Sequence, residues 1–215
     1  MRLPELRSCD DLKKLVLKVG FLPLFRCEVP GFSVEDLTPD ELWFKKDVIG
    51  PWEWREEIAE EGEIAYAKLF HGKAGFLSRE LYPDFANYRR EGYDFDARVD
   101  DGLVKNAERQ IYGLIANGTT VSSELRRQFS GKGFETALAA LQMRMYVTFR
   151  CLEYKKDRYG VPYGWGMARY ELCEERFGEL CTAAYEREPS ESLRVIEERM
   201  KEYLSREQVQ SLLKG

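Results

Sequence analysis

Residues 119–170 constrain the fold more than any other stretch of the chain. Hydroxyl side chains precede residues 124–129, the pattern of a short helix with a capping residue at its start. After a glycine-containing break, residues 134–145 place apolar side chains on one face of a second helix. Residues 146–154 and 165–172 are typical of two strands, and the link between them is polar and contains glycine and proline. This order of helix, tight turn, helix and hairpin predicts a winged helix-turn-helix.

The same segment is basic in a chain that is acidic overall. The chain has a formal net charge of −5, whereas residues 119–170 contain nine Lys and Arg against four Asp and Glu. A local concentration of positive charge is typical of a surface that meets a polyanion, although a solvated hairpin would also be polar. We predict that double-stranded DNA is the partner. Its backbone would be contacted by Arg126, Arg127, Lys132, Arg144, Lys155, Lys156 and Arg158.

The second helix of this unit is poorly suited to reading bases. Its first exposed positions would be Glu135 and Thr136, whereas base readout favours Arg, Asn and Gln. Contacts to phosphates therefore fit better than sequence-specific contacts. The outer face of the helix, with Ala139 and Ala140, could equally dock against another domain or a second copy. A protein-interaction or dimerisation module, with a possible homodimer, therefore stays open.

Several common chemistries lack the residues that they need. The five cysteines are widely spaced and form no Cys-x-x-Cys pair, which predicts reduced thiols in a cytoplasmic protein. His71 is the only histidine and is expected in a turn, so a zinc site or a histidine-activated nucleophile is disfavoured. The sequence has no glycine-rich phosphate loop and no apolar run of membrane-spanning length. We expect no cofactor, no metal and no membrane association.

The rest of the chain predicts helices around a small hairpin. Residues 8–19 form a capped helix that Gly20 ends, and residues 64–78 form the hairpin. Pro23 argues against a central strand in the apolar segment around it. A short helix is expected to start at residues 38–41 and to end at residue 50. Further helices are expected over residues 78–88 with an interruption at Pro83, 97–117, 174–187 and 190–204.

These elements predict an α+β fold that is mainly helical. It would be a winged helix-turn-helix with an additional N-terminal subdomain of helices and a hairpin. The expected divisions are an N-terminal subdomain at 1–93, a winged-helix domain at 94–172 and C-terminal helices at 173–215.

The N-terminal half resembles the AlkZ/YcaQ-type DNA glycosylases. Residues 20–25 are similar to their Gly-Leu-Leu-Gln-x-Asp/Gln segment, and residues 52–55 to their Tyr-Trp-x-His segment. Residues 73–83 are similar to their Glu-Ala-Ser-Leu-Leu-Pro-x-Glu-Leu-Tyr-Pro segment. The resemblance covers about half of a chain that is shorter than those enzymes. It implies a winged-helix architecture, in agreement with the pattern of residues 119–170.

The departures from this family bear on activity. In the family, two polar side chains that alternate along one strand position and activate water beneath the extruded nucleotide. Pro23 and Phe25 stand at the matching positions, and Arg55 matches the histidine of the second segment. None of these residues could replace the water-activating pair, so the resemblance implies a relative without glycosylase activity and without catalytic residues.

Other residue groups allow more than one interpretation. An active glycosylase could use Glu53, Glu56 and Glu57 instead, provided that their environments separate their pKa values. Arg89 and Arg90 could hold phosphate or simply end a helix. An aromatic group could form a base-stacking platform, although core packing is the simpler interpretation; it comprises Trp43, Trp52, Trp54, Tyr66 and Phe70.

Overall fold

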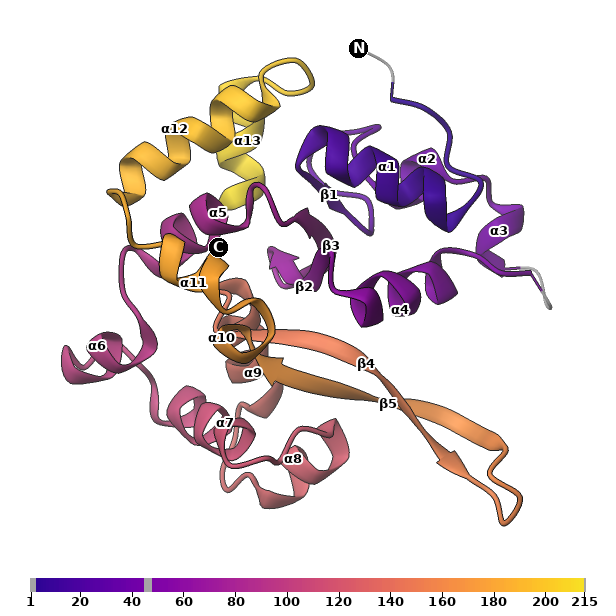
Figure 1. The fold of residues 1–215 in the computed structure, drawn as a ribbon, viewed down its shortest axis with the longest axis vertical. Helices are drawn as coiled ribbons and strands as arrows, with labels where there is room; N and C mark the ends of the chain where they lie inside the picture. The colour runs from indigo at the N-terminus through magenta and orange to yellow at the C-terminus, as the bar shows by residue number, and fades with distance from the viewer. Residues whose placement is uncertain (1–2, 45–47, 215) are drawn as a thin grey trace.

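Helices surround two small antiparallel sheets in the computed structural model, which describes residues 3–44 and 48–214 (Figure 1). The first sheet has the strand order β1-β3-β2, and the second is the hairpin of β4 and β5. About half of the chain is helical. The structure is therefore α+β, as the sequence predicts.

The elements follow one another in mixed order along the chain. The strands are β1 (Phe21–Pro23), β2 (Ile64–Phe70), β3 (Lys73–Ser78), β4 (Val147–Lys156) and β5 (Pro162–Leu172). The helices are α1 (Cys9–Val19), α2 (Val34–Leu37), α3 (Glu41–Phe44), α4 (Pro51–Glu61), α5 (Tyr82–Arg90), α6 (Phe95–Asp100), α7 (Asn106–Ala116), α8 (Ser122–Gln128), α9 (Phe134–Met143), α10 (Cys173–Phe177), α11 (Glu179–Ala183), α12 (Pro189–Met200) and α13 (Arg206–Leu213). Within the described residues, every helix is too short or too polar to span a bilayer.

Local sequence signals set the N-terminal elements. The Ser8 hydroxyl accepts a hydrogen bond from the backbone N–H of Asp11 at 3.1 Å, and α1 ends at Gly20 with φ of 103°. Pro23 lies in β1, which is an edge strand of its sheet, where the missing N–H costs no central ladder bond. Opposite it stands Gly75, where an added Cβ would come within 2.3 Å of the Phe70 ring. Glycine therefore lets Phe70 pack flat on the sheet.

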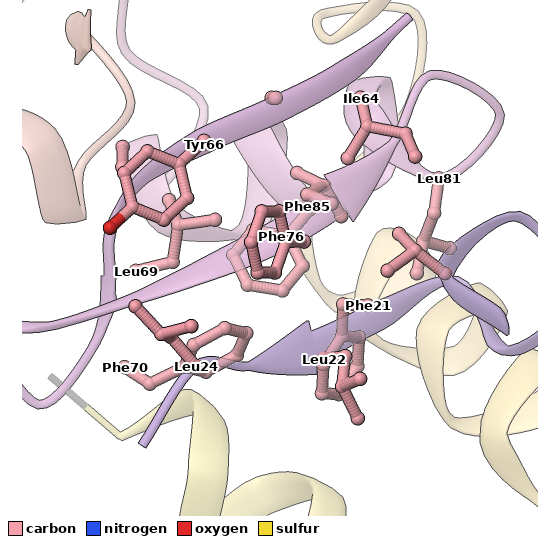
Figure 2. Packing of buried hydrophobic residues seen from close by; sticks show 14 of the residues in the cluster. Phe21, Leu22, Leu24, Ile64, Tyr66, Leu69, Phe70, Phe76, Leu81 and Phe85 are labelled. Carbon is pink, nitrogen blue, oxygen red and sulfur yellow. The ribbon is translucent and has the colours of Figure 1, made fainter. Parts of the chain in front are cut away.

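Buried apolar side chains form two clusters. Figure 2 shows part of the first cluster, in which Phe21, Phe70 and Phe76 come from the three-stranded sheet and Phe85 from α5. The second cluster gathers side chains of α6, α7, α8, α9 and the base of the β4–β5 hairpin. The first cluster also takes in the C-terminal helices and Phe149 of β4. The N-terminal sheet and the C-terminal helices therefore share one core. The division into three domains stays a prediction.

Several of the expected helices have different bounds. The long helix over 97–117 is wrong, because the chain leaves the helix after Asp100 and passes through Gly102 at φ of 69° before α7 begins. Pro83 does not interrupt a helix either. It lies in the first turn of α5, where its missing N–H is tolerated. In α8 the N-cap residue is Val121, and no side chain caps the helix start.

Two other helical expectations are also corrected. The helix expected from residues 38–41 to residue 50 is α3, which covers only Glu41–Phe44; residues 48–50 are not helical, and residues 45–47 lie outside the described part of the chain. The helix expected over 174–187 is divided into α10 and α11 by Gly178, whose φ is 38°. The last long helix begins at Pro189 and ends at Met200.

Candidate nucleic-acid interface

The β4–β5 hairpin consists of a packed half and a free half. Its strands pair antiparallel from Val147 opposite Leu172 to Lys156 opposite Pro162, with register shifts along β4. The first residues of β4 are buried, whereas its last residues and the first residues of β5 are exposed. Figure 1 shows the free half extending away from the rest of the molecule. We call residues 154–165 the hairpin arm.

The turn of the hairpin arm is organised by its own sequence. One carboxylate oxygen of Asp157 accepts hydrogen bonds from the backbone N–H of Tyr159 at 2.8 Å and of Val161 at 2.9 Å. Gly160 takes a φ of 81°, which favours glycine. The turn is therefore held by its own backbone, and at its base the arm contacts α4 through a hydrogen bond from the Tyr154 hydroxyl to Glu56 at 3.3 Å.

The hairpin arm combines free cations with exposed aromatic rings. Lys155, Lys156 and Arg158 are exposed, and within residues 3–44 and 48–214 none of them forms an ion pair. The one acid of the arm, Asp157, is engaged with the backbone of the turn. Trp165 is 95% exposed, far more than its apolar area would suggest. The other exposed aromatic residues of the arm are Tyr154, Tyr159 and Tyr163.

The exposure of these aromatic side chains is not evident from the sequence. Strand residues such as Tyr163 and Trp165 ordinarily face a core, so their exposure was not evident from the pattern. One sequence feature does indicate exposure: these residues lie beside a polar turn, at strand ends that have no apolar segment to pack against.

The arginines at the base of the hairpin have partners within the protein. Arg150 lies 3.7 Å from Glu171 on the opposite strand. Arg169 forms an ion pair with Glu153 and also donates to the Thr120 hydroxyl at 2.8 Å. These cations therefore hold the hairpin to itself and to the loop before α8. The excess positive charge of residues 119–170 is correspondingly smaller at the surface than the sequence count suggests.

The remaining predicted DNA-contacting residues fall into two places. Arg126 and Arg127 are exposed on α8, and Lys132 is exposed in the following loop. Helix α8 lies beside the packed half of the hairpin, where Ser123 donates to the sulfur of Met167 at 3.0 Å. Arg126 forms an ion pair with Glu135, whereas Arg127 and Lys132 form none within the described residues.

Arg144 belongs to a different neighbourhood. It lies just beyond the C-terminal end of α9, and its guanidinium is 3.1 Å from the buried carboxylate of Glu108. The structure thus places α8 beside the packed half of the hairpin, and it pairs Arg144 with α7 instead.

Helix α9 is covered along much of its length. Its C-terminal half lies against β2, where the side-chain oxygen of buried Gln142 accepts the backbone N–H of Lys68 at 3.2 Å. Strand β4 is also linked to β2, by a hydrogen bond from the Thr148 hydroxyl to the Tyr66 carbonyl at 3.2 Å. Glu135 and Thr136 at the other end remain exposed. This packing agrees with the expectation that the helix docks against another part of the protein.

The two residues that match the family's water-activating pair lie in apolar surroundings in this chain. Pro23 is buried, and the ring of Phe25 packs 5.8 Å from that of Trp52 and 6.3 Å from that of Trp43, measured between centroids. Arg55, at the position of the family's histidine, lies 4.6 Å over the Trp52 ring. This corner of the molecule is an aromatic packing site with a cation on its rim.

The three glutamates of the alternative catalytic interpretation differ in environment. Glu53 accepts the backbone N–H of Gly50 at 2.9 Å and so stabilises the start of α4. Glu57 lies 2.8 Å from Lys13, whose hydrogen bond lowers the pKa of this carboxyl. Glu56 accepts a hydrogen bond from the Tyr154 hydroxyl at 3.3 Å, and burial raises its pKa. Glu56 thus has an environment that favours a protonated carboxyl, in contrast to Glu57.

The other candidate groups have structural roles. Trp43, Trp54, Tyr66 and Phe70 are buried, so core packing is the correct interpretation for them, and Trp52 lies at the surface. Arg89 and Arg90 are both buried, so neither forms an exposed phosphate-binding helix end.

The histidine and the cysteines also have defined places. His71 occupies the β2–β3 turn with φ of 48°, and its Nε2 is 2.8 Å from the Ser211 carbonyl. All five cysteines are free thiols. Among the residues that the structure describes, no group of three or more His, Cys, Asp or Glu side chains is arranged to hold a metal ion.

Comparison with known proteins decides the family. The model of the family described as AlkZ related matches residues 6–215, nearly the whole chain. The chain belongs to the AlkZ-related family. This confirms the resemblance that the N-terminal motifs carry. No curated protein matches this AlkZ-related sequence.

A comparison with solved structures matches the chain to the DNA glycosylase AlkZ of Streptomyces sahachiroi. It shares 13% sequence identity with this AlkZ-related chain, at a TM-score of 0.45. The similarity covers 89% of this chain and 50% of that glycosylase. The chain therefore spans about half the length of the protein that it matches.

Proposed function

We propose that this AlkZ-related chain binds double-stranded DNA through a winged-helix unit and does not remove bases with the residues at positions 23 and 25. The unit, over residues 94–172, would comprise α7, α8, α9 and the β4–β5 hairpin, with the hairpin arm as its wing. The observation that carries this proposal is the exposed arm, in which three cations lie among exposed aromatic rings and form no ion pair with any residue that the structure describes.

The chemistry of the hairpin arm fits a nucleic-acid backbone. Lysine and arginine side chains contact phosphates and release condensed counterions, which gives affinity without sequence specificity. Exposed aromatic rings such as Trp165 add flat apolar surface that can lie against sugars or unstacked bases. Arg127 and Lys132 beside the hairpin would extend the contact along the duplex.

Backbone contacts are favoured over base readout by the packing of α9. A helix whose C-terminal half is fixed against β2 presents only its first turn to a groove. That turn carries Glu135, whose carboxylate would repel phosphates and whose partner is Arg126. We therefore propose that α8, its loop and the hairpin arm make the DNA contacts, and that Arg144 contributes less than the sequence suggests.

The experiment is duplex affinity as a function of salt. Replacing Lys155, Lys156 and Arg158 together by alanine removes three phosphate contacts, so we expect the slope of log K against log salt to fall by about 2.7. Fluorescence anisotropy with a labelled duplex, from about 50 to about 200 mM salt, gives this slope.

A matched control keeps the total charge change the same. Lys14, Lys18 and Arg194 are exposed and unpaired within the described residues, and they lie on α1 and α12. Their triple alanine variant should bind the duplex with the slope of the wild type. Equal losses in the two variants would show that net charge, and not the hairpin arm, governs binding.

A second candidate function is a glycosylase that uses Glu56. It is favoured by the raised pKa of this carboxyl and by its hydrogen bond from Tyr154, which comes from the hairpin arm itself. Abasic-site formation on alkylated duplex, lost in Glu56→Gln and kept in Glu60→Gln, would support it. Wild-type protein that leaves every lesion intact would remove it.

The hairpin arm could instead meet a protein. Light scattering over a range of concentrations, with and without DNA, separates this alternative from the first. A mass that doubles without DNA and returns to the monomer value when Trp165 is replaced by alanine would assign the arm to a homodimer. The free thiols fit the cytoplasmic location that we propose for this chain.

A further inference from the structure

A cavity of about 240 Å³ lies where α5, α6 and the end of α9 meet. Its walls include Arg89, Arg98 and Arg144, together with Glu91, Ala140 and Met143. Water in the liquid occupies about 30 Å³ per molecule, so the cavity has room for several waters or for a small oxyanion. Three guanidinium groups around one cavity form a concentration of buried positive charge that the proposed DNA contacts do not use.

Arg89 has no carboxylate partner among the described residues. Only 9% of the residue is exposed, and one Nη atom donates to the carbonyl of Leu69. Its Nε is buried and has no hydrogen-bond partner in the described structure. Burial lowers the pKa of Arg89 to about 10, as expected for a cation removed from water without an opposing charge.

Arg90, which follows Arg89 in the sequence, is a buried arginine whose charge is compensated. Arg90 is fully buried, yet its guanidinium lies 2.8 Å from the Glu174 carboxylate and 2.7 Å from the Tyr185 hydroxyl. Arg89 and Arg90 come from the same helix turn and differ in this respect. Arg89 has only the Leu69 carbonyl and the Phe85 ring, 5.4 Å away, as partners, and a buried charge without an opposing charge is rare in folded proteins.

The other two arginines are only partly neutralised. Arg98 is buried and donates to the carbonyl of Arg90 and to Glu91, but its Nε also has no partner in the described structure. The Glu91 side chain is mostly exposed, which weakens its share of the compensation. Arg144 is paired with Glu108. Three guanidinium groups thus face two carboxylates, and the cavity keeps a net positive charge.

We propose that this cavity is a binding site for a phosphate-type oxyanion. Such an anion supplies the opposing charge that Arg89 lacks among the described residues. Guanidinium groups match the oxygens of phosphate in a bidentate arrangement. Inorganic phosphate and a phosphodiester of a DNA backbone offer the same oxyanion, and the experiment distinguishes them. The hairpin arm extends away from α5 and α6 (Figure 1), so the site goes beyond the proposed wing contacts.

The first measurement uses the full chain and inorganic phosphate. Isothermal titration at constant ionic strength, with chloride as the replaced anion, should show saturable binding to the wild type. Arg89→Gln removes the charge and keeps a polar side chain of smaller size, so we expect at least a tenfold loss of affinity. Arg194→Gln, an exposed arginine on α12, should bind phosphate like the wild type.

A second variant protects the test if Arg89→Gln unfolds. Met143→Glu leaves every arginine in place and adds a carboxylate to the cavity wall. The new carboxylate should pair with the arginines of the cavity and so abolish phosphate binding, while the circular dichroism spectrum stays that of the wild type. Phosphate that binds both variants as tightly as the wild type, or no saturable binding to any of them, would overturn the proposal.

A duplex titration then identifies the source of the oxyanion. If the site receives a DNA phosphate, inorganic phosphate competes with duplex at fixed ionic strength, and Arg89→Gln weakens the duplex complex. If it receives a free phosphate, Arg89→Gln loses phosphate binding and keeps the duplex affinity. The DNA proposal is tested separately, by the duplex affinity of the triple alanine variant of the hairpin arm. The phosphate titration can therefore support the oxyanion site even if the DNA proposal fails.

Discussion

The fully buried guanidinium of Arg90 lies 2.8 Å from the carboxylate of Glu174. The same guanidinium donates to the carbonyl of Met145 and stacks 4.7 Å from the Tyr146 ring. Met145 belongs to the first apolar cluster and Tyr146 to the second, so this ion pair lies where the two cores meet. Helix α5, which carries Arg90, is thereby fixed to α10 and to the start of β4.

Glu174→Gln should destabilise the protein strongly. The change leaves a buried cation with neutral partners only. Because the Glu174 side chain is itself 39% exposed, we expect a cost of about 1–3 kcal/mol, the range for a buried group that loses its partner. Urea denaturation followed by circular dichroism gives the free energy of unfolding. Glu175→Gln, at the adjacent exposed position, should change it by less than about 0.5 kcal/mol. Similar midpoints for the two variants would show that the Arg90 charge is compensated elsewhere.

Gln142→Leu should weaken the docking of α9 on β2. Leucine is close in size, but it cannot accept the backbone N–H of Lys68, and an unsatisfied buried donor costs about 1–3 kcal/mol. The control is Gln128→Leu on the exposed face of α8. Hydrogen exchange at the Lys68 amide should quicken in the first variant only. An unchanged exchange rate would mean that this hydrogen bond is not what holds the helix.

The stability of Glu56→Gln relative to the wild type should depend on pH. Because burial raises the pKa of Glu56, the folded state holds this proton more tightly than the unfolded state does. Below the ordinary glutamate pKa of about 4.3, both proteins carry a neutral side chain here. As pH rises through the raised pKa, the wild type must ionise a half-buried carboxyl and loses stability, whereas the glutamine variant does not.

Denaturation midpoints from about pH 4 to about pH 8 test this dependence. The difference in free energy of unfolding should move in favour of Glu56→Gln as pH rises and then level off. Glu60→Gln on the exposed side of α4 supplies the comparison. A difference that moves in the opposite direction would show that contacts to the ionised form, such as those with Arg55 and Tyr154, outweigh burial.

Local signals made much of the fold predictable from the sequence. The capped start of α1, its end at Gly20 and the two hairpins follow from short-range patterns that the backbone obeys directly. The break between α6 and α7 was not predictable in this way, because apolar periodicity continues across Gly102. The pattern records which side chains face a core and not whether the backbone between them stays helical.

The candidate site was predictable only in part. The cations of the hairpin arm follow from a polar turn between two strands, and the structure leaves them exposed. The pairing of Arg144 with Glu108 and of Arg150 with Glu171 joins residues that are distant in the sequence, so counting charges could not reveal it. The family was recognisable because its motifs are short and local, as in residues 73–83.

Trp165→Ala should weaken duplex binding without changing stability. The side chain is 95% exposed, so its removal takes little from the folded core, and surface substitutions of this kind stay within about 0.5 kcal/mol. An aromatic contact to nucleic acid contributes about 1–3 kcal/mol, which corresponds to at least a fivefold loss of affinity. Trp165→Phe keeps an aromatic face and should retain most of the binding. Anisotropy at one salt concentration measures the affinities, and thermal denaturation checks the fold. Affinity that is the same for all three proteins would restrict the arm's role to its cations.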